Sequence, residues 1–399
     1  MAIQPARRLA AIAPSPTLAI SARAKELTAA GRDVLDLSAG EPDFTTPEHI
    51  RAAAVAALEC GDTHYTPVDG TPALKRAIAL KFARENGLEY AANELIATCG
   101  AKQALFNLCL ALLNPRDEVL IPAPYWVSYP PMVRLAEAEP VIVSCSADTG
   151  FKLAAQALAD SLTPKTRLVI LNSPCNPSGA AYTREELEGL AEVLAEHPQV
   201  FVATDDIYEH LLYRDSGFVN LPMVVPALRS RCIVVNGVSK SYAMTGWRLG
   251  YAAGPAWLIG AMKKLQSQST SNPASVSQAA AAAALTGDQR CVAEMHEAFR
   301  TRRDRFVEGL NKLMGMHCAL PDGAFYAFAD CREAIAAHGL EDDIAFAEWL
   351  LEKAEIAAVP GSAFGTPGYV RFSYATSQAA LDDALTRMDK ALGKNCCGR

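Results

Sequence analysis

The chain reads CIVVNGVSKSYAMTGWRLG over residues 232–250, and this stretch contains its most informative residue, Lys240. An apolar strand pattern at 232–235 precedes the lysine, and Arg248 follows eight residues after it. A lysine in a partly dry pocket has a lowered pKa, so its neutral amine can form a Schiff base with an aldehyde. A nearby arginine can hold an anionic group of the same molecule. The stretch therefore predicts a site for an anionic aldehyde, with a solvated surface lysine as the alternative.

Short β-branched runs alternate with helical patterns on both sides of this stretch. The expected strands are residues 94–98, 118–121, 140–143, 167–171, 200–203, 232–235 and 248–252, and the helices between them include 102–113 and 184–196. This alternation is typical of the α/β class and predicts a mostly parallel, seven-stranded sheet sandwiched by helices. Ligands on such sheets gather at the carboxyl ends of the strands, where Lys240 is expected.

The pattern changes near residue 288, where a long charged helix at 291–313 begins a second lobe of α+β type. Its other expected elements are strands at 324–329, 357–359 and 370–374 and helices at 343–354 and 378–392. We expect an N-terminal segment (1–47) that joins this smaller domain through a strand at 34–37. A large ligand-binding domain (48–287) and the small C-terminal domain (288–399) follow.

Composition excludes several classes of function. With 399 residues, the chain is long enough for two lobes. A net charge of −7 and the absence of a long basic stripe argue against nucleic-acid binding. The longest uncharged stretch, 265–287, is too polar to span a membrane, so a soluble, cytoplasmic protein is expected. The 11 cysteines are odd in number and irregularly spaced, which favours reduced thiols and predicts no metal site.

Two loops after expected strands contain groups that can be aimed at a ligand. Gly100, Ala101 and Lys102 lie where a strand passes into a helix, and small residues there let backbone N–H groups approach a phosphate. Residues 172–179 read NSPCNPSG, and the two prolines and terminal glycine can fix the direction of the Asn176 amide. A sterically required glycine and a plain Asn-Pro turn are the alternatives.

Two charged residues are expected to be buried. Asp205 ends an apolar strand and needs a cationic partner, for which a pyridinium N–H would serve. Tyr208, three residues on, could donate to a phenolate oxygen of the same ring. Arg371 lies in an apolar strand and could pair with a substrate carboxylate. The alternatives are a helix-capping aspartate with a core tyrosine, and an internal ion pair for the arginine.

In this order and combination the motifs resemble those of the class I, fold-type I pyridoxal-phosphate-dependent aminotransferases. The similarity is greatest to the bacterial aspartate aminotransferase branch. It runs over nearly the whole chain, from PSPT at 14–17 and AGEPDF at 39–44 to Arg371.

The resemblance implies that pyridoxal 5′-phosphate is joined to Lys240, which also moves protons during the reaction, and that Asp205 and Tyr208 assist catalysis. Trp126 is implied to stack on the cofactor ring. Tyr65 is implied to reach the phosphate of the neighbouring subunit, which predicts a homodimer with shared active sites. The remaining implied cofactor contacts are Ala101, Lys102, Asn176, Ser239 and Arg248.

The resemblance also implies amino-acid and 2-oxo-acid substrates, with transfer from L-aspartate to 2-oxoglutarate. Gly40 and Arg371 would meet the α-carboxylate. Lys102, assisted by Ser15 or Thr17, would meet the second carboxylate. The implied substrate contacts are Gly40, Ser15, Thr17, Lys102, Trp126, Asn176 and Arg371.

One departure from the family pattern concerns Ala13. Members that also accept prephenate carry a lysine at this point, so Ala13 argues against prephenate as a substrate. Other readings stay open: an aromatic or alanine aminotransferase, a pyridoxal-phosphate-dependent β-lyase on the same scaffold, or a non-catalytic ligand-sensing domain.

Overall fold

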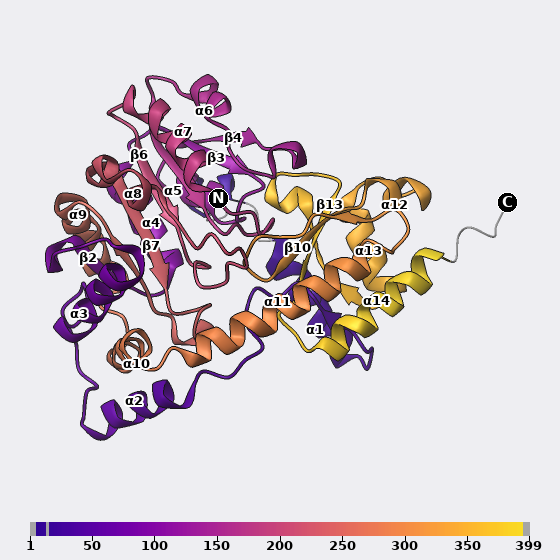
Figure 1. Ribbon diagram of the computed structural model, residues 1–399, viewed down its shortest axis with the longest axis horizontal. Coiled ribbons are helices and arrows are strands. Elements are labelled where there is room, and N and C mark those ends of the chain that lie inside the picture. Colours follow the sequence, from indigo (N-terminus) through magenta and orange to yellow (C-terminus); the bar gives the residue numbers. More distant parts are fainter. Residues whose placement is uncertain (1–4, 13–15, 394–399) are drawn as a thin grey trace, which may run out of the picture.

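The computed structural model describes residues 5–12 and 16–393, and its centre is a seven-stranded sheet in the order β2-β8-β7-β6-β5-β3-β4 (Figure 1). β8 pairs antiparallel with both of its neighbours, and the other pairings are parallel. The predicted α/β fold with a mostly parallel sheet is therefore confirmed. The strands are β2 (Leu95–Thr98), β3 (Glu118–Ala123), β4 (Glu139–Ser144), β5 (Thr166–Asn172), β6 (Phe201–Asp205), β7 (Cys232–Gly237) and β8 (Gly250–Ala253).

Side chains that alternate along these strands face two separate layers of helices. On β5, Leu168 and Ile170 belong to one buried cluster, whereas Val169 and Leu171 belong to another. This is the period-2 alternation of a sheet that is covered on both faces. One face is covered by α4 (Ala101–Leu112), α5 (Tyr129–Leu135) and α9 (Ala256–Ser267). The other is covered by α6 (Ala155–Ser161), α7 (Arg184–Ala195), α8 (Leu221–Val224), α2 (Glu48–Glu59), α3 (Pro72–Lys81) and α10 (Ser275–Thr286).

The expected strand at 248–252 is wrong at its start. Arg248 has a φ of 53° and follows a short 3₁₀ turn at Thr245–Trp247. A residue in the left-handed region cannot continue a strand, so the chain enters the sheet only at Gly250. This local turn directs the Arg248 side chain toward Gly100, at the start of α4.

The second lobe contains an antiparallel sheet in the order β12-β13-β10-β9, and a parallel pair, β1 with β11. Its strands are β1 (Leu35–Asp36), β9 (His317–Cys318), β10 (Tyr326–Asp330), β11 (Ile356–Ala357), β12 (Val359–Pro360) and β13 (Tyr369–Ser373). Its helices are α1 (Pro16–Ala29), α11 (Arg290–Leu310), α12 (Arg332–Ala337), α13 (Asp343–Lys353) and α14 (Gln378–Leu392).

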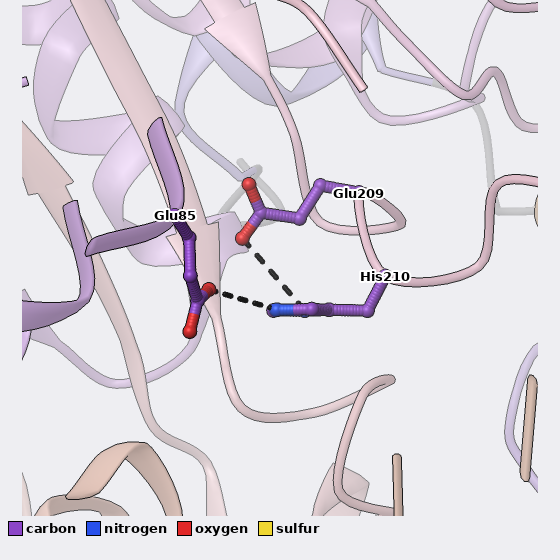
Figure 2. A group of neighbouring side chains, drawn as sticks. All are labelled: Glu85, Glu209 and His210. Carbon is purple, nitrogen blue, oxygen red and sulfur yellow. Dashed lines mark hydrogen bonds and ion pairs between the residues drawn. The ribbon is translucent and has the colours of Figure 1, made fainter. Parts of the chain in front are cut away.

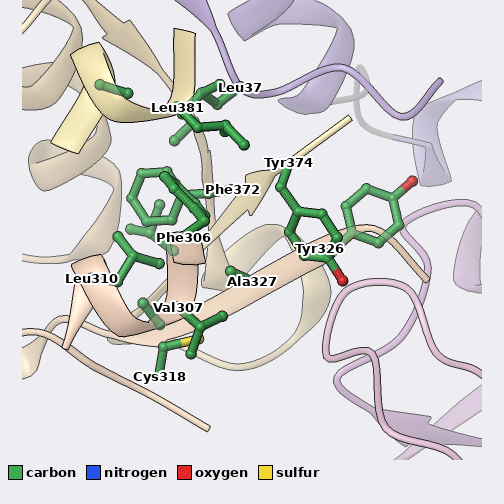
Figure 3. Packing of buried hydrophobic residues seen from close by; sticks show 14 of the residues in the cluster. Leu37, Phe306, Val307, Leu310, Cys318, Tyr326, Ala327, Phe372, Tyr374 and Leu381 are labelled. Atoms are coloured by element: carbon green, nitrogen blue, oxygen red, sulfur yellow. The ribbon is translucent and has the colours of Figure 1, made fainter. Parts of the chain in front are cut away.

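One buried cluster joins the N-terminal segment to this lobe. Leu37 belongs to the same cluster as Phe306 and Leu310 of α11, Phe372 of β13 and Leu381 of α14 (Figure 3). Truncating a buried phenylalanine such as Phe306 typically costs about 3–5 kcal/mol, so this cluster strongly stabilises the lobe. The division of the chain at 47/48 and 287/288 stays a prediction. Within the described residues, no helix has the length and apolarity to cross a membrane.

Candidate active site

Lys240 lies in the turn that follows β7, in front of the carboxyl end of the sheet. A backbone hydrogen bond of 3.1 Å from the Met244 N–H to the Ser239 carbonyl closes the turn around it. Its Nζ donates to the carbonyl oxygen of Gly40. Burial lowers the pKa of Lys240 to about 8, and the positive charge of Arg248 adds to the effect. The Lys240 ammonium therefore loses its proton more readily than that of an ordinary lysine.

Asp205 is the last residue of β6 and is only 5% exposed. Its Oδ2 accepts a hydrogen bond of 2.6 Å from the Tyr129 hydroxyl, whereas its Oδ1 is buried and has no partner among the described residues. Burial raises the pKa of Asp205 to about 6, although the Tyr129 hydrogen bond opposes the rise. A buried carboxylate oxygen without a donor is costly, so this atom is suited to an N–H or cationic group of a ligand.

Arg371 enters from the second lobe, on β13, and is 2% exposed. Its Nη1 donates to Asn176 Oδ1 at 2.8 Å and its Nη2 to the Ser38 carbonyl at 2.7 Å. The Nε atom is buried without a partner, and no carboxylate of the described residues pairs with this guanidinium. Burial lowers the pKa of Arg371. The internal ion pair considered as the alternative is absent within residues 5–12 and 16–393, which leaves the guanidinium for an external anion.

Tyr208 and Tyr326 connect the two lobes at the site. Their hydroxyl groups are 2.8 Å apart, and the guanidinium of Arg371 lies 4.5 Å from the centre of the Tyr326 ring. Tyr208 follows β6 and Tyr326 begins β10, so one hydrogen bond links the large sheet to the small one. Sequence reasoning found Tyr208 and missed Tyr326.

The first turn of α4 forms a second part of the site. Gly100 precedes the helix with a φ of 86°, and a Cβ on it would lie 2.3 Å from Nη2 of Arg248. A Cβ on Gly250 would lie 2.2 Å from the Ala101 backbone nitrogen. Both glycines therefore permit a close approach of Arg248 and β8 to the free N–H groups of α4. Ser239 is buried beside Lys240.

Lys102 and Trp126 form the outer edge of this part. The Lys102 Nζ lies 4.9 Å from the centre of a Trp126 ring, and Trp126 packs edge-on against Tyr129 at 5.4 Å. Burial of its amine and the charge of Arg248 lower the pKa of Lys102.

Tyr65 is not brought into this cluster, and the structure does not describe the side chains of Ser15 and Thr17. Tyr65 is 91% exposed and borders a hollow of about 430 Å³ that Arg76 and Gln278 also line. Thr17 lies in α1. Ser15 and Ala13 lie outside the described residues.

Sequence reasoning also missed residues whose roles depend on contacts between distant segments. Tyr129 donates to Asp205, 76 residues away in the chain. The Nδ2 of Asn172 donates to the Asp205 carbonyl at 2.8 Å, and its Oδ1 accepts from the Asn176 N–H at 2.8 Å. Only Asn172 had a usable signal, because it opens the NSPCNPSG loop.

The fold and these contacts define an α/β enzyme whose site is arranged to hold an aldehyde, a ring N–H and anionic groups. A family model described as aminotransferase class I and II matches residues 32–388. The chain belongs to this family. Members use pyridoxal 5′-phosphate, and the protein is a pyridoxal-phosphate-dependent aminotransferase.

Relatives are similar to the chain over nearly its full length. An aspartate/prephenate aminotransferase of Nitrosomonas europaea is 52% identical over 392 residues, which cover 97% of this chain and 99% of that protein. An aspartate aminotransferase of Rhizobium meliloti is 50% identical over 393 residues, or 97% of this chain and 96% of that protein.

Solved structures agree with these relatives. The crystal structure of the aspartate aminotransferase from Rhizobium meliloti matches with a TM-score of 0.95 and 49% identity, covering 98% of this chain and 99% of that one. The Thermus thermophilus aspartate aminotransferase with maleate matches with a TM-score of 0.92 and 44% identity, covering 98% and 100%.

Proposed function

We propose that this protein transfers the amino group of L-aspartate to 2-oxoglutarate, giving oxaloacetate and L-glutamate in a ping-pong cycle. The observation that carries the proposal is the buried, unpartnered Oδ1 of Asp205 in the same site as the low-pKa amine of Lys240. The names of the Nitrosomonas and Rhizobium relatives support aspartate as the amino donor.

The residues of the site fit pyridoxal phosphate. Its pyridine N–H would fill the open oxygen of Asp205, and the Lys240 amine would hold its aldehyde carbon. Its phosphate needs backbone donors and a cation, which Ala101 at the start of α4 and Arg248 supply. The other residues proposed to contact the cofactor are Lys102, Trp126, Asn176, Tyr208, Ser239 and, from a neighbouring subunit, Tyr65.

Bound pyridoxal phosphate supplies a conjugated ring that withdraws negative charge from the substrate Cα. Lys240 takes the proton from Cα, and a pKa of about 8 suits this role because it lies close to physiological pH. The carboxylate of Asp205 would accept a hydrogen bond from the ring N–H and so favour the protonated ring nitrogen. The Gly40 carbonyl, which accepts from the Lys240 Nζ in this structure, helps to direct the amine.

Arg371 binds the α-carboxylate of the substrate. Its guanidinium is held in place by Asn176 and the Ser38 carbonyl, and it lacks an acidic partner in the described part of the chain. Because Asn176 uses its Oδ1 for Arg371, its Nδ2 stays available for the oxygen on the cofactor ring. A guanidinium fixed in this way orients a carboxylate by paired hydrogen bonds.

The second carboxylate of aspartate is assigned to Lys102, with Ser15 and Thr17 as assisting residues. Lys102 lies against Trp126, so a carboxylate near Lys102 would also lie beside the aromatic ring. The Thermus thermophilus structure contains maleate, a dicarboxylate, which supports a family site for two carboxylates.

We further propose a homodimer with shared active sites, located in the cytoplasm. The support is Tyr65, which is 91% exposed and does not contact the site of its own chain. In the proposed dimer this tyrosine, which projects from the surface beside a hollow, would donate to the phosphate bound by a second copy. This arrangement would bury the exposed ring.

Half-reactions with a panel of amino acids test the proposed specificity. Purified protein loaded with pyridoxal phosphate is mixed with aspartate, alanine or phenylalanine, and the change in its visible absorption band is followed. Aspartate is expected to react fastest, and far faster turnover of alanine or phenylalanine would remove the dicarboxylate assignment. Release of pyruvate and ammonia without a keto-acid acceptor would identify a β-lyase instead.

Prephenate is tested in the same experiment as an amino acceptor. The name of the Nitrosomonas europaea relative includes prephenate. The expectation from Ala13 is that prephenate is not accepted, and residue 13 lies outside the described residues. Conversion of the aminated protein by prephenate as fast as by 2-oxoglutarate would overturn that expectation.

A further inference from the structure

A buried ionic cluster lies behind the loop that carries Asp205 and Tyr208. Its centre is Lys81, the last residue of α3, which is 0% exposed. The Lys81 Nζ pairs with Glu209 and also lies 2.7 Å from Asn86 Oδ1 and 3.5 Å from Glu85 Oε2. The same six-residue loop, 205–210, therefore faces the active site with one set of side chains and this cluster with the other.

Three members of the cluster could in principle ligate a metal ion. Glu85, Glu209 and His210 lie close together with their polar atoms converging (Figure 2). These carboxylates do not need a metal ion to balance their charge, however, because the Lys81 ammonium already pairs with Glu209. Asn236 also donates to Glu209 Oε1 at 2.9 Å. The cluster is therefore an internal ion pair with His210 hydrogen-bonded to its edge.

His210 connects the cluster to the lysine turn. Its Nε2 lies 2.9 Å from Glu85 Oε2, and its Nδ1 lies 2.8 Å from Ser241 Oγ. Burial acts to raise the pKa of Glu85, but His210 and Lys81 outweigh it and the pKa falls to about 2. Glu85 is then a carboxylate that only accepts, so His210 Nε2 carries the hydrogen and Nδ1 faces the serine hydroxyl.

Ser241 is the residue directly after Lys240, in a turn that needs support. Ala243 has a φ of 50°, a strained conformation for a residue with a Cβ. On one side the Thr46 hydroxyl donates to the Ala243 carbonyl at 2.7 Å. On the other side the described contact is that of Ser241 with His210. The turn that carries Lys240 is thus held from two directions.

We infer that Glu85, His210 and Ser241 form a positioning relay that fixes the turn of Lys240, so that its amine is aimed into the active site. This inference rests on the proposed role of Lys240 and adds three residues that do not touch the reacting atoms. The relay transmits the rigidity of the buried ion pair, through one imidazole, to the residue beside the reacting amine. Its effect is on geometry, because each link is a directional hydrogen bond.

Two substitutions of His210 separate the two ends of the relay. The amide of His210→Asn reaches roughly where Nδ1 lies, so it keeps the contact with Ser241. The amide of His210→Gln reaches roughly where Nε2 lies, so it keeps the contact with Glu85 and loses Ser241. Ser241→Ala removes the last link alone and is the third variant.

The readouts are kcat, KM for aspartate and the rate at which the visible band appears when the apoprotein is mixed with pyridoxal phosphate. We expect Ser241→Ala and His210→Gln to lower kcat and the rate of band formation about tenfold each, because misplacing a reacting group slows its chemistry. KM should change less than about twofold, since substrate binding is left intact. His210→Asn keeps the link to Ser241 but loses the link to Glu85, so both of its rates should fall, though less than those of His210→Gln. The double variant His210→Gln/Ser241→Ala should be no slower than the slower of the two single variants.

Two results overturn the inference. One is wild-type kcat and band formation in Ser241→Ala. The other is an equal loss in His210→Asn and His210→Gln together with a lower unfolding midpoint of both apoproteins, which is the behaviour of a purely structural histidine. Failure of the proposed function is distinguishable, because the unmodified protein itself would then turn over alanine or phenylalanine far faster than aspartate, whereas failure of the relay shows only in the variants.

Discussion

Two buried carboxylates lie in the loop 205–210: Asp205 faces the active site on the front of the loop, and Glu209 faces the buried ionic cluster on its rear. On the rear side, Lys81 pairs directly with Glu209. On the front side, Lys240 donates only to a carbonyl oxygen, and Asp205 keeps one oxygen without a partner among the described residues. Both carboxylates are buried in the same stretch of six residues.

The difference shows in the pKa of each acid. Burial acts to raise the pKa of both, but the Lys81 ammonium outweighs burial at Glu209 and lowers its pKa. At Asp205 burial prevails, and the pKa rises to about 6. A buried charge with a complete set of partners stabilises the fold, whereas one with an open position is placed to meet a ligand.

Lys240→Ala is expected to have the largest effect, on activity alone. Loss of a general acid–base group in this position should lower turnover by about 10⁴-fold. The unfolding midpoint of the apoprotein should not fall, because the amine forms no ion pair in the described structure. Glutamate formation from aspartate and 2-oxoglutarate, together with thermal unfolding followed by circular dichroism, measures both. Retention of more than about a tenth of wild-type turnover would remove Lys240 from the mechanism.

Lys81→Met should affect stability instead. Removing one partner of a buried ion pair leaves Glu209 without its ammonium partner, a change that typically costs about 3–5 kcal/mol. Urea unfolding of the apoprotein measures the loss, and the double variant Lys81→Met/Glu209→Gln should recover part of it. If Lys81→Met were as stable as the unmodified protein, the pair of Lys81 and Glu209 would not stabilise the fold.

The two lysines should also differ in reactivity. In the apoprotein, Lys240 is expected to react with trinitrobenzenesulfonate with a midpoint at pH about 8, because burial lowers its pKa from 10.5. Lys81 should not react in the folded state, since it is 0% exposed and its amine is held by Glu209. Peptide mapping after brief labelling across a pH series measures each site. A Lys240 midpoint at the value of ordinary lysines would contradict the buried, unpaired environment.

Asp205→Asn should stabilise the apoprotein at neutral pH. The folded pKa is raised from 3.8 to about 6, so Asp205 favours folding below pH 3.8 and this contribution is lost as the pH rises through about 6. The substitution removes the buried charge. It should raise the free energy of unfolding by as much as about 3 kcal/mol above pH 6 and change it little below pH 3.8.

Glu209→Gln is the matched control for this experiment, measured by urea unfolding over the same pH series. Because the pKa of Glu209 is lowered, its charge stabilises the folded state above its unfolded pKa. Its neutralisation should therefore destabilise the protein at neutral pH. Asp205→Asn and Glu209→Gln, four residues apart, would then change the free energy of unfolding in opposite directions. A change of the same sign in both would contradict the difference between the open and the paired carboxylate.

Much of the fold could be predicted because the signals are local. The β-branched runs at 167–171 and 200–203 correspond to β5 and β6, and the Thr183–Glu186 capping box begins α7 with hydrogen bonds of 2.8 and 3.3 Å. The strand predicted to begin at Arg248 failed because a residue with positive φ gives no signal in a hydrophobic pattern.

The candidate site was predictable only in part. Lys240, Asp205 and Arg371 could be singled out because a charged residue in an apolar run needs an explanation. Tyr129 and Tyr326 could not, because an aromatic residue in an apolar run is ordinary core. Their hydrogen bonds to Asp205 and Tyr208 join residues 76 and 118 positions apart.

The sequence by itself determined the α/β class, most of the strand segments along the chain and the charged residues that follow them, since periodicity and turn chemistry act over a few residues. It did not give the order of these strands in the sheet. Only the tertiary structure decided which buried charge is paired and which is left open. The sequence singles out Asp205 because it ends an apolar strand, but it does not show that Glu209, four residues on, is also buried and has a lysine partner. The physical reason is that the charge of a buried carboxylate is set by the donors around it, and here those donors come from α3, α5 and β7, which only folding brings together.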